Sequence, residues 1–152
     1  MKQVGPVAVS NLATKMGIPN VPAYPSICLG TFDSSIFNMV GAYGAFANKG
    51  TYTKPIYLLR IEDKNGVVLF SQKEIPKPIM SEEVAYVMTR MLKGVVSNGT
   101  GSRLNYKYKV NAPIGAKTGT TQNNSDGWFM GITKDLVTGV WVGADGIGYT
   151  TA

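Results

Sequence analysis

Three short apolar segments in the last third of the chain constrain its fold most. They cover residues 113–120, 127–133 and 136–144, and they are rich in Thr, Val, Trp and Phe. Only a few turn-forming residues separate one segment from the next. Neighbouring strands joined by such short links must run antiparallel, because a parallel crossover needs about a dozen residues or more. These segments therefore predict an antiparallel β-meander.

Earlier in the chain, apolar residues recur at helical spacing and predict helices over residues 7–16, 35–48 and 82–97. Pro6 suits the first position of the first helix, Asp33 or Ser34 can cap the second, and Ser81 can cap the third. Residues 18–30, with three prolines, predict a loop. The third helix carries an apolar stripe that we expect to pack in the core: Val84, Val87, Met88, Met91, Leu92 and Val95.

Between the second and third helices the apolar period changes to two. Asn65-Gly66 separates residues 57–63 from residues 67–71, which is a strong hairpin signal. Because two strands alone are marginal in water, we expect this hairpin to rest against another element. The whole pattern predicts an α+β fold, an antiparallel β-meander with packed helices.

Composition excludes several classes of site. The chain has no His, which excludes a Ser-His-Asp triad and any His-ligated metal within it. Cys28 is the single cysteine, so we expect no internal disulfide and a buried thiol. The net charge of +6 comes from scattered residues, so we expect no nucleic-acid partner. The Gly-rich residues 98–101 lack the spacing of a nucleotide-binding loop.

Lys117-Thr118-Gly119-Thr120, on the first strand of the meander, carries the strongest chemical signal. A lysine can hold a carboxylate, and threonine hydroxyls can donate hydrogen bonds to the same group. Glycine lets a ligand approach the strand closely because it has no Cβ. The strand edge could also pair with an extended peptide. On the motif alone, ordinary strand residues with a surface lysine remain an equal alternative.

The rest of the chain resembles the transpeptidase domain of class A penicillin-binding proteins, the bifunctional peptidoglycan synthases. The matching stretches follow the family's order over nearly the whole length. They are Leu29-Gly30, Ala42-Tyr43-Gly44-Ala45-Phe46-Ala47-Asn48-Lys49-Gly50, Lys54-Pro55-Ile56, Leu92-Lys93-Gly94-Val95-Val96 with Gly99-Thr100-Gly101, Gly115-Ala116-Lys117-Thr118-Gly119-Thr120-Thr121, Asp126-Gly127-Trp128-Phe129-Met130-Gly131 and Val140-Trp141-Val142-Gly143.

This resemblance implies a partial penicillin-binding or serine β-lactamase-like transpeptidase fold, and roles for four residues. Lys117 and Thr118 would recognise the carboxylate of a donor stem peptide or a β-lactam, beside Gly119. Thr120 would add a hydroxyl, and its backbone N–H would form half of the oxyanion hole. The nucleophilic serine would supply the other half. We expect Trp128, on the next strand, to pack beneath the sheet, with Phe129, more readily than to touch substrate.

The catalytic motifs of the family are missing from these residues. None of the nine serines has Lys three positions later or Asn two positions later, so Ser-x-x-Lys and Ser-x-Asn are absent. Ser125-Asp126 lacks the following Asn and comes after Lys117, so it does not take the Ser-x-Asn role. We therefore expect residues 1–152 to be the C-terminal part of a transpeptidase domain, inactive alone. A non-catalytic peptide or cell-wall binding module and a degenerate paralogue remain alternatives.

The resemblance also implies partners and a location. Stem peptides and β-lactams would bind through the complete domain, with no cofactor, since the chemistry is acyl transfer through a serine ester. The location would be the cell envelope, at the outer face of the bacterial inner membrane. No segment here is apolar enough to span that membrane, so an anchor would lie outside these residues. Exposed edges of an incomplete sheet lead us to expect self-association.

Overall fold

A computed structural model describes residues 3–143, apart from the side chain of Asn123. Its centre is a three-stranded sheet made of β5 (Gly115–Thr120), β6 (Asp126–Ile132) and β7 (Val137–Gly143). The strands pair antiparallel in the order β5-β6-β7. The predicted meander is thus confirmed, with the last predicted position, Ala144, outside the described residues.

Three main helices form where apolar periodicity predicts them. They are α1 (Pro6–Lys15), α2 (Ile36–Ala47) and α3 (Glu82–Asn98). Ser81 caps α3 as predicted, accepting a hydrogen bond from the Val84 amide at 3.4 Å. The cap of α2 is Ser35, which accepts from the Asn38 amide at 3.2 Å. The prediction of Asp33 or Ser34 as this cap is wrong, because the helix begins at Ile36, one residue later than predicted.

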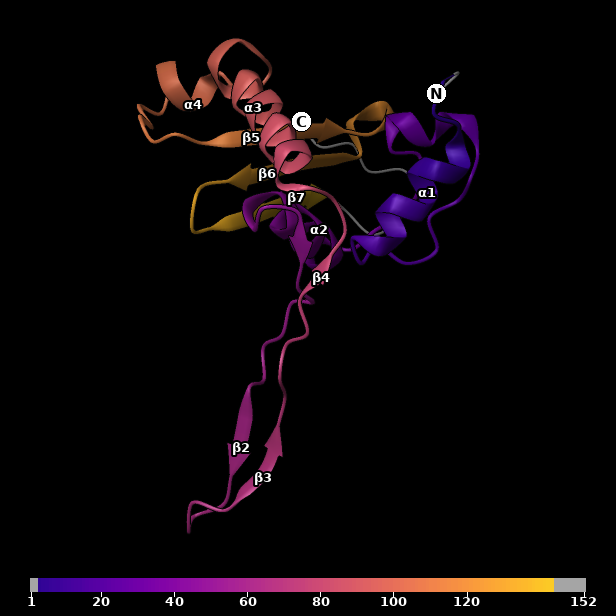
Figure 1. The fold of residues 1–152 in the computed structure, drawn as a ribbon. Coiled ribbons are helices and arrows are strands. Elements are labelled where there is room, and N and C mark those ends of the chain that lie inside the picture. The colour runs from indigo at the N-terminus through magenta and orange to yellow at the C-terminus, as the bar shows by residue number, and fades with distance from the viewer. Residues whose placement is uncertain (1–2, 144–152) are drawn as a thin grey trace.

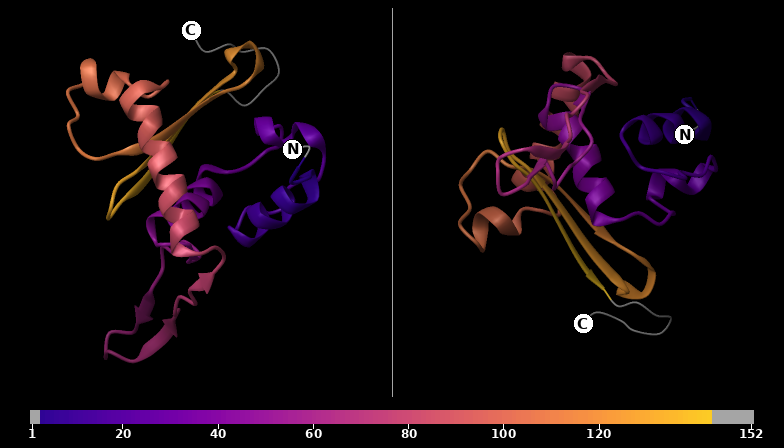
Figure 2. Two further views of the ribbon diagram at one scale, coloured as in Figure 1. Left: turned by 45° about the horizontal axis from the view of Figure 1, so that its top comes forward. Right: turned by 90° about the horizontal axis from the view of Figure 1, so that it is seen from below.

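Two of these helices cover one face of the sheet. A Cβ built on Gly115 would lie 3.0 Å from Leu92 Cβ on α3, so α3 presses closely on β5. A Cβ on Gly139 would lie 2.7 Å from Ile36 Cδ1 on α2. The β6 partners of the two glycines are two residues apart and therefore share a face. Figure 2 shows α3 lying across the strands on this side.

A second apolar cluster joins the N-terminal third to α2. It includes the segment after α1 and the short 3₁₀ helix η1 (Pro25–Leu29), which the predicted loop did not anticipate. The buried members are Met16, Ile18, Val21, Ile27, Ala42 and Ala45. Small alanines on α2 let this segment approach the helix closely.

The hairpin is an arm that projects from the body of the molecule (Figure 1). Its strands β2 (Arg60–Glu62) and β3 (Val68–Ser71) pair with each other, and every residue in both is exposed. The expectation that the hairpin rests on another element is therefore wrong. Local hydrogen bonds hold the turn at the tip of the hairpin: Asp63 Oδ1 accepts from the amides of Asn65 at 2.7 Å and Val67 at 2.9 Å. At its base, β1 (Thr51–Tyr52) pairs with β4 (Lys77–Pro78).

The apolar stripe of α3 is only partly buried. Leu92 packs in the core as expected, together with Ala85 and Val96. Val84, Val87 and Met91 are each more than half exposed, which contradicts their predicted place in the core. These side chains stay exposed because β5 and α2, against which α3 packs, cover only part of the apolar stripe of the helix. After α3 comes a short helix, α4 (Arg103–Tyr106), that was not predicted.

Gly50, at the base of the arm, gives a test of this packing. Its φ is +88°, and its carbonyl accepts from the amides of Ile79 at 3.0 Å and Met80 at 3.2 Å. A Cβ there would overlap the backbone carbonyl oxygen of Met80. Gly50→Ala should therefore lower the free energy of unfolding by at least about 2 kcal/mol.

Gly44→Ala is the matched control for Gly50→Ala. Gly44 lies inside α2 with nothing within 4 Å of a built Cβ. Alanine there should raise the unfolding free energy by about 0.5–1 kcal/mol. Urea unfolding followed by circular dichroism measures both variants. Equal effects of the two substitutions would contradict the packing described at Gly50.

Candidate functional site

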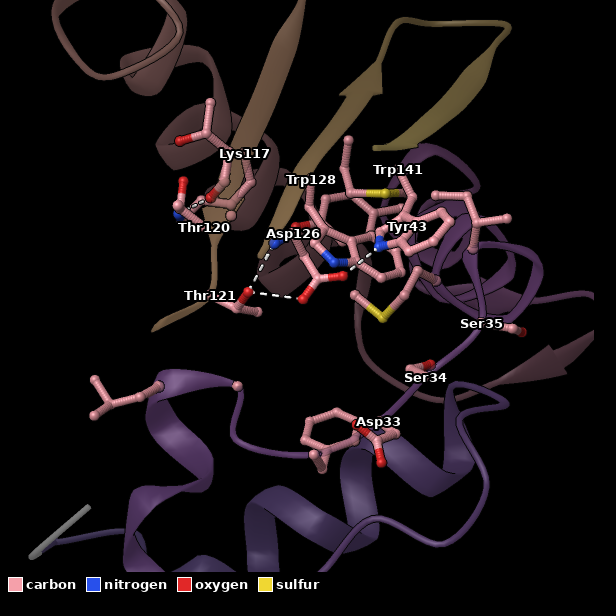
Figure 3. A pocket seen from close by; sticks show the side chains of 18 of the residues that line it. Asp33, Ser34, Ser35, Tyr43, Lys117, Thr120, Thr121, Asp126, Trp128 and Trp141 are labelled. Carbon is pink, nitrogen blue, oxygen red and sulfur yellow. Dashed lines mark hydrogen bonds between the residues drawn. The ribbon is translucent and has the colours of Figure 1, made fainter. Parts of the chain in front are cut away.

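A cleft of about 990 Å³ opens on the helix-covered face of the sheet, between the strands and α2. One wall comes from β5, β6 and β7 and includes Lys117, Trp128 and Trp141. The facing wall comes from residues 27–36 and from α2, which contributes Met39 and Tyr43. Figure 3 shows Lys117, Thr120 and Thr121 on the β5 side, with the rings of Trp128, Trp141 and Tyr43 grouped beside them and Ser34 on the facing segment. The cleft thus joins an apolar floor to the Lys117 strand.

The backbone of β5 presents free groups at one rim of this cleft. The Thr121 amide donates to the Asp126 carbonyl at 3.2 Å, so these two residues form a hydrogen-bonded pair. In an antiparallel ladder such pairs alternate with pairs whose backbone groups point outward. Thr120, paired with Gly127, is therefore an outward residue, and its N–H faces the edge away from β6. Among the described strands, none pairs with that edge.

Lys117 and Thr118 lie at the same edge. Lys117 Nζ donates to the Thr118 carbonyl oxygen at 2.6 Å, and the side chain of Lys117 is exposed. The Thr118 carbonyl points outward like that of Thr120, because the two residues are two positions apart. An ammonium group, threonine hydroxyls and outward amides therefore gather along a few residues of edge strand. Such an edge can hold an anionic group and the oxygen of a neighbouring carbonyl.

Gly119 and Trp128 meet across the pair of strands. They are register partners, and a Cβ on Gly119 would lie 3.1 Å from Trp128 Cβ. Trp128 lies on the helix-covered face of the sheet, where it is half-buried and lines the cleft, so its predicted packing beneath the sheet is only partial. Phe129, also half-buried, alternates to the opposite face. Because Gly119 has no side chain, Trp128 can lie close against β5 in the wall of the cleft.

Asp126 is a feature of the cleft that the motif analysis missed. Its carboxylate accepts from Thr121 Oγ1 at 2.7 Å, Trp141 Nε1 at 2.8 Å and Ser125 Oγ at 3.0 Å. These donors come from the end of β5, the turn and β7, as Figure 3 shows for Thr121 and Trp141. They lower the pKa of Asp126, with Thr121 first and then Trp141 and Ser125, while burial opposes them. The hydroxyl-rich turn was visible in the sequence, but its link to Trp141 was not.

Three hydrogen bonds join Thr121 and Asp126, and two of them involve the Thr121 hydroxyl. Besides donating to the carboxylate, its Oγ1 accepts from the Asp126 amide at 3.0 Å. Because Thr121 directly follows Thr120, this exchange pins the end of the strand that carries the outward N–H. The cluster therefore ties all three strands together at the mouth of the cleft.

The facing wall contains two more polar groups. Cys28 is an exposed free thiol, which contradicts its predicted burial. The one-turn helix η1 turns Ile27 inward, so its neighbour Cys28 faces out toward the cleft. Ser34 Oγ is buried and has no hydrogen-bond partner among the described residues.

Two searches of residues 3–143 bear on other classes of site. No group of three or more His, Cys, Asp or Glu side chains lies close enough to hold a metal ion there. No helix in the same range is both long and apolar enough to cross a bilayer.

Asp126→Asn tests the carboxylate cluster through its pH dependence. Because the three donors lower the pKa of the folded carboxylate, its ionised form stabilises the fold above the ordinary aspartate pKa of about 3.9. That contribution disappears as the pH falls through the lowered pKa of the folded state. The variant should therefore unfold at lower urea concentration than the native protein at about pH 7, with a smaller difference at about pH 3.

Asp135→Asn, in the turn before β7, is the control for this measurement, since Asp135 lies outside the cluster. It should change the urea midpoint little at either pH. A difference between the native protein and Asp126→Asn that stays constant with pH would contradict the role given to the ionised carboxylate.

Comparison with known proteins places this cleft in a family. A family model described as the penicillin binding protein transpeptidase domain matches residues 25–147. Penicillin-binding protein 1A of Aquifex aeolicus is 35% identical over 145 residues, which cover 95% of this chain and 20% of that protein. The chain thus spans about a fifth of the length of this relative.

Solved structures agree with the sequence relatives. Penicillin-binding protein 1A from Haemophilus influenzae superposes with a TM-score of 0.83 over 98% of this chain and 29% of the other, at 22% identity, which shows the shared fold. The PonA1 protein from Mycobacterium tuberculosis, solved in complex with penicillin V, is 27% identical with a TM-score of 0.75 over 91% of this chain and 41% of that one. The family match covers most of the described sheet, helices and cleft, and the chain belongs to the penicillin-binding protein transpeptidase family.

Proposed function

We propose that this chain forms the substrate-binding wall of a peptidoglycan D,D-transpeptidase, an enzyme that cross-links stem peptides by serine acyl transfer. The observation that carries the proposal is the outward-facing edge of β5, where Lys117, Thr118 and the Thr120 N–H lie within four residues. Family membership supports the reaction class. The geometry supports the part of the reaction that these residues perform.

Lys117 and the hydroxyls of Thr118 and Thr120 bind the terminal carboxylate of the donor peptide. Among the described residues, Lys117 Nζ donates to the Thr118 carbonyl of its own strand at 2.6 Å, so an anion can recruit the ammonium by a small side-chain motion. Charge-assisted hydrogen bonds to a carboxylate are about twice as strong as neutral ones. The carboxylate of a β-lactam binds at the same groups, which is consistent with the penicillin V complex of the related PonA1 protein.

Thr120 supplies one donor of an oxyanion hole through its backbone N–H. As the attacked carbonyl becomes tetrahedral, its oxygen gains charge, and a preorganised N–H stabilises that charge more than the ground-state carbonyl. The amide faces the open edge because the pairing of β5 with β6 uses alternate residues. The second donor is the N–H of the nucleophilic serine, so these residues hold half of the hole.

The nucleophile comes from outside these 152 residues. None of the nine serines is followed by Lys at the third position, so the chain lacks a serine activated by a neighbouring lysine at that spacing. This census also favours a second candidate: a non-catalytic peptide or cell-wall binding module, or a degenerate paralogue, using the same edge. The two candidates differ in whether the complete reading frame encodes Ser-x-x-Lys followed by Ser-x-Asn.

We also propose a location and an assembly tendency. A stem-peptide substrate places the complete protein in the cell envelope, at the outer face of the bacterial inner membrane, with any anchor outside the described residues.

Val140 and Val142 are about half exposed on the uncovered sheet face, and described strands leave both sheet edges unpaired. Such surfaces favour pairing between copies of the isolated chain, which light scattering at increasing concentration measures.

Intact-mass spectrometry after incubation with benzylpenicillin tests the proposed function. The 152-residue chain should show no covalent adduct, because it binds the carboxylate but has no activated serine. A protein extended upstream through Ser-x-x-Lys and Ser-x-Asn should gain the mass of one penicillin. Changing the serine of Ser-x-x-Lys to Ala should abolish that gain.

Two results would contradict this account. A stoichiometric adduct on the 152-residue chain would show that it carries a nucleophile of its own. An extended protein that folds, contains both motifs and gains no mass would favour the non-catalytic candidate.

A further inference from the structure

The hydroxyl of Thr118 already has a partner from outside the sheet. Thr100 Oγ1 lies 2.6 Å from Thr118 Oγ1, across eighteen residues of sequence. Thr100 belongs to the Gly-rich loop 98–101, which begins at the last residue of α3 and lacks the spacing of a nucleotide-binding loop. The structure gives that loop a different task, because it brings a hydroxyl to the middle of the Lys117–Thr120 strand.

The loop is built to hold Thr100 in place. The amides of Gly99 and Gly101 both donate to the Val95 carbonyl, at 3.1 and 3.0 Å, so the chain folds back over the end of α3. A Cβ on Gly99 would lie 2.8 Å from Val95 Cα, and one on Gly101 would lie 3.3 Å from the Val95 carbonyl oxygen. Asn105 Nδ2 then donates to the Val96 carbonyl at 3.1 Å. Glycine on both sides of Thr100 is what this tight fold requires.

The same helix connects the loop to the strand. Leu92 of α3 presses on Gly115 at the start of β5, so the helix that leads into the loop packs directly on the strand. The loop that carries Thr100 is therefore anchored to the same strand that carries Thr118.

One of the two hydroxyls, whose oxygens lie 2.6 Å apart, donates its hydrogen to the other, and which one donates decides what Thr118 can still do. If Thr118 donates to Thr100, its only hydrogen is used. If Thr100 donates to Thr118, the Thr118 hydrogen remains free for another acceptor. A negatively charged acceptor at the strand edge favours the second direction, and the Thr100 donor then polarises the Thr118 hydroxyl and strengthens its bond.

We propose that Thr100 is a positioning residue that keeps the Thr118 hydrogen directed at the substrate carboxylate. Thr100 does not touch the substrate and acts only through Thr118. This inference rests on the proposed function, in which Thr118 binds that carboxylate. It assigns the loop 98–101 to substrate binding and makes the end of α3 part of the site.

The test uses the protein encoded by the complete reading frame and stopped-flow acylation by benzylpenicillin. This measurement separates the dissociation constant of the first, non-covalent complex from the rate constant of acylation. Thr100→Val keeps the shape and removes the hydroxyl. It should raise the dissociation constant about three- to tenfold, the worth of one weakened hydrogen bond, and change the acylation rate constant by less than about twofold.

Two further variants distinguish positioning from damage to the fold. Thr100→Ser restores a hydroxyl and should return the dissociation constant to within about twofold of the native value. Thr138→Val changes an exposed threonine on β7, away from the β5 edge, and should leave both constants unchanged. Thr100→Ala replaces the valine variant if that protein does not fold, with the same expected result.

The outcomes separate this inference from the proposed function. If the native protein is acylated but Thr100→Val binds penicillin as tightly as the native protein, the Thr100 proposal is overturned alone. It is also overturned if Thr100→Ser is as weak as Thr100→Val, or if Thr138→Val weakens binding equally. A native protein that is not acylated at all would overturn the proposed function, and the role of Thr100 with it.

Discussion

The pairing of β5 with β6 is the constraint on which the rest of the site depends. Because backbone groups alternate along an antiparallel strand, the hydrogen bond from Thr121 to Asp126 turns the amide of Thr120 outward. A register shift of one residue would turn that amide into the sheet and move Lys117 to the other face. Which groups face the open edge of β5 is therefore decided by register as much as by residue type.

Register is held at both ends of β5. At its start, Gly115 allows α3 to approach so closely that a single Cβ would meet Leu92. At its end, the carboxylate of Asp126 gathers hydroxyl and indole donors from the neighbouring strands. Between these anchors, Thr100 reaches Thr118 from the end of α3. The contacts that hold β5 in place thus leave the backbone groups at its open edge unpaired by any described strand.

Local patterns predicted much of the fold. The meander, the three helices, the hairpin turn and the Ser81 cap follow from periodicity and turn chemistry, which act over a few residues. The errors concern contacts between distant segments. Nothing local shows that Val84 and Met91 of α3 lack a covering partner, or that the hairpin stands free.

The site divides in the same way. Lys117, Thr118, Gly119 and Thr120 could be singled out because they form a contiguous motif on one predicted strand, and their roles remain a proposal. The cluster around Asp126 could not, since Trp141 lies fifteen residues away and meets the carboxylate only through strand pairing. Cys28 was misplaced for a related reason: one turn of 3₁₀ helix can bury Ile27 or its neighbour, and only tertiary packing decides which.

The central claim is that the edge of β5 binds the carboxylate and the attacked carbonyl of an acyl donor. A crystal structure of the upstream-extended protein acylated by benzylpenicillin tests it most directly. The account predicts the acyl carbonyl oxygen within hydrogen-bonding distance of the Thr120 N–H, and the penicillin carboxylate against Lys117 and the Thr118 hydroxyl. An acyl group whose carbonyl and carboxylate both lie away from β5 would contradict it.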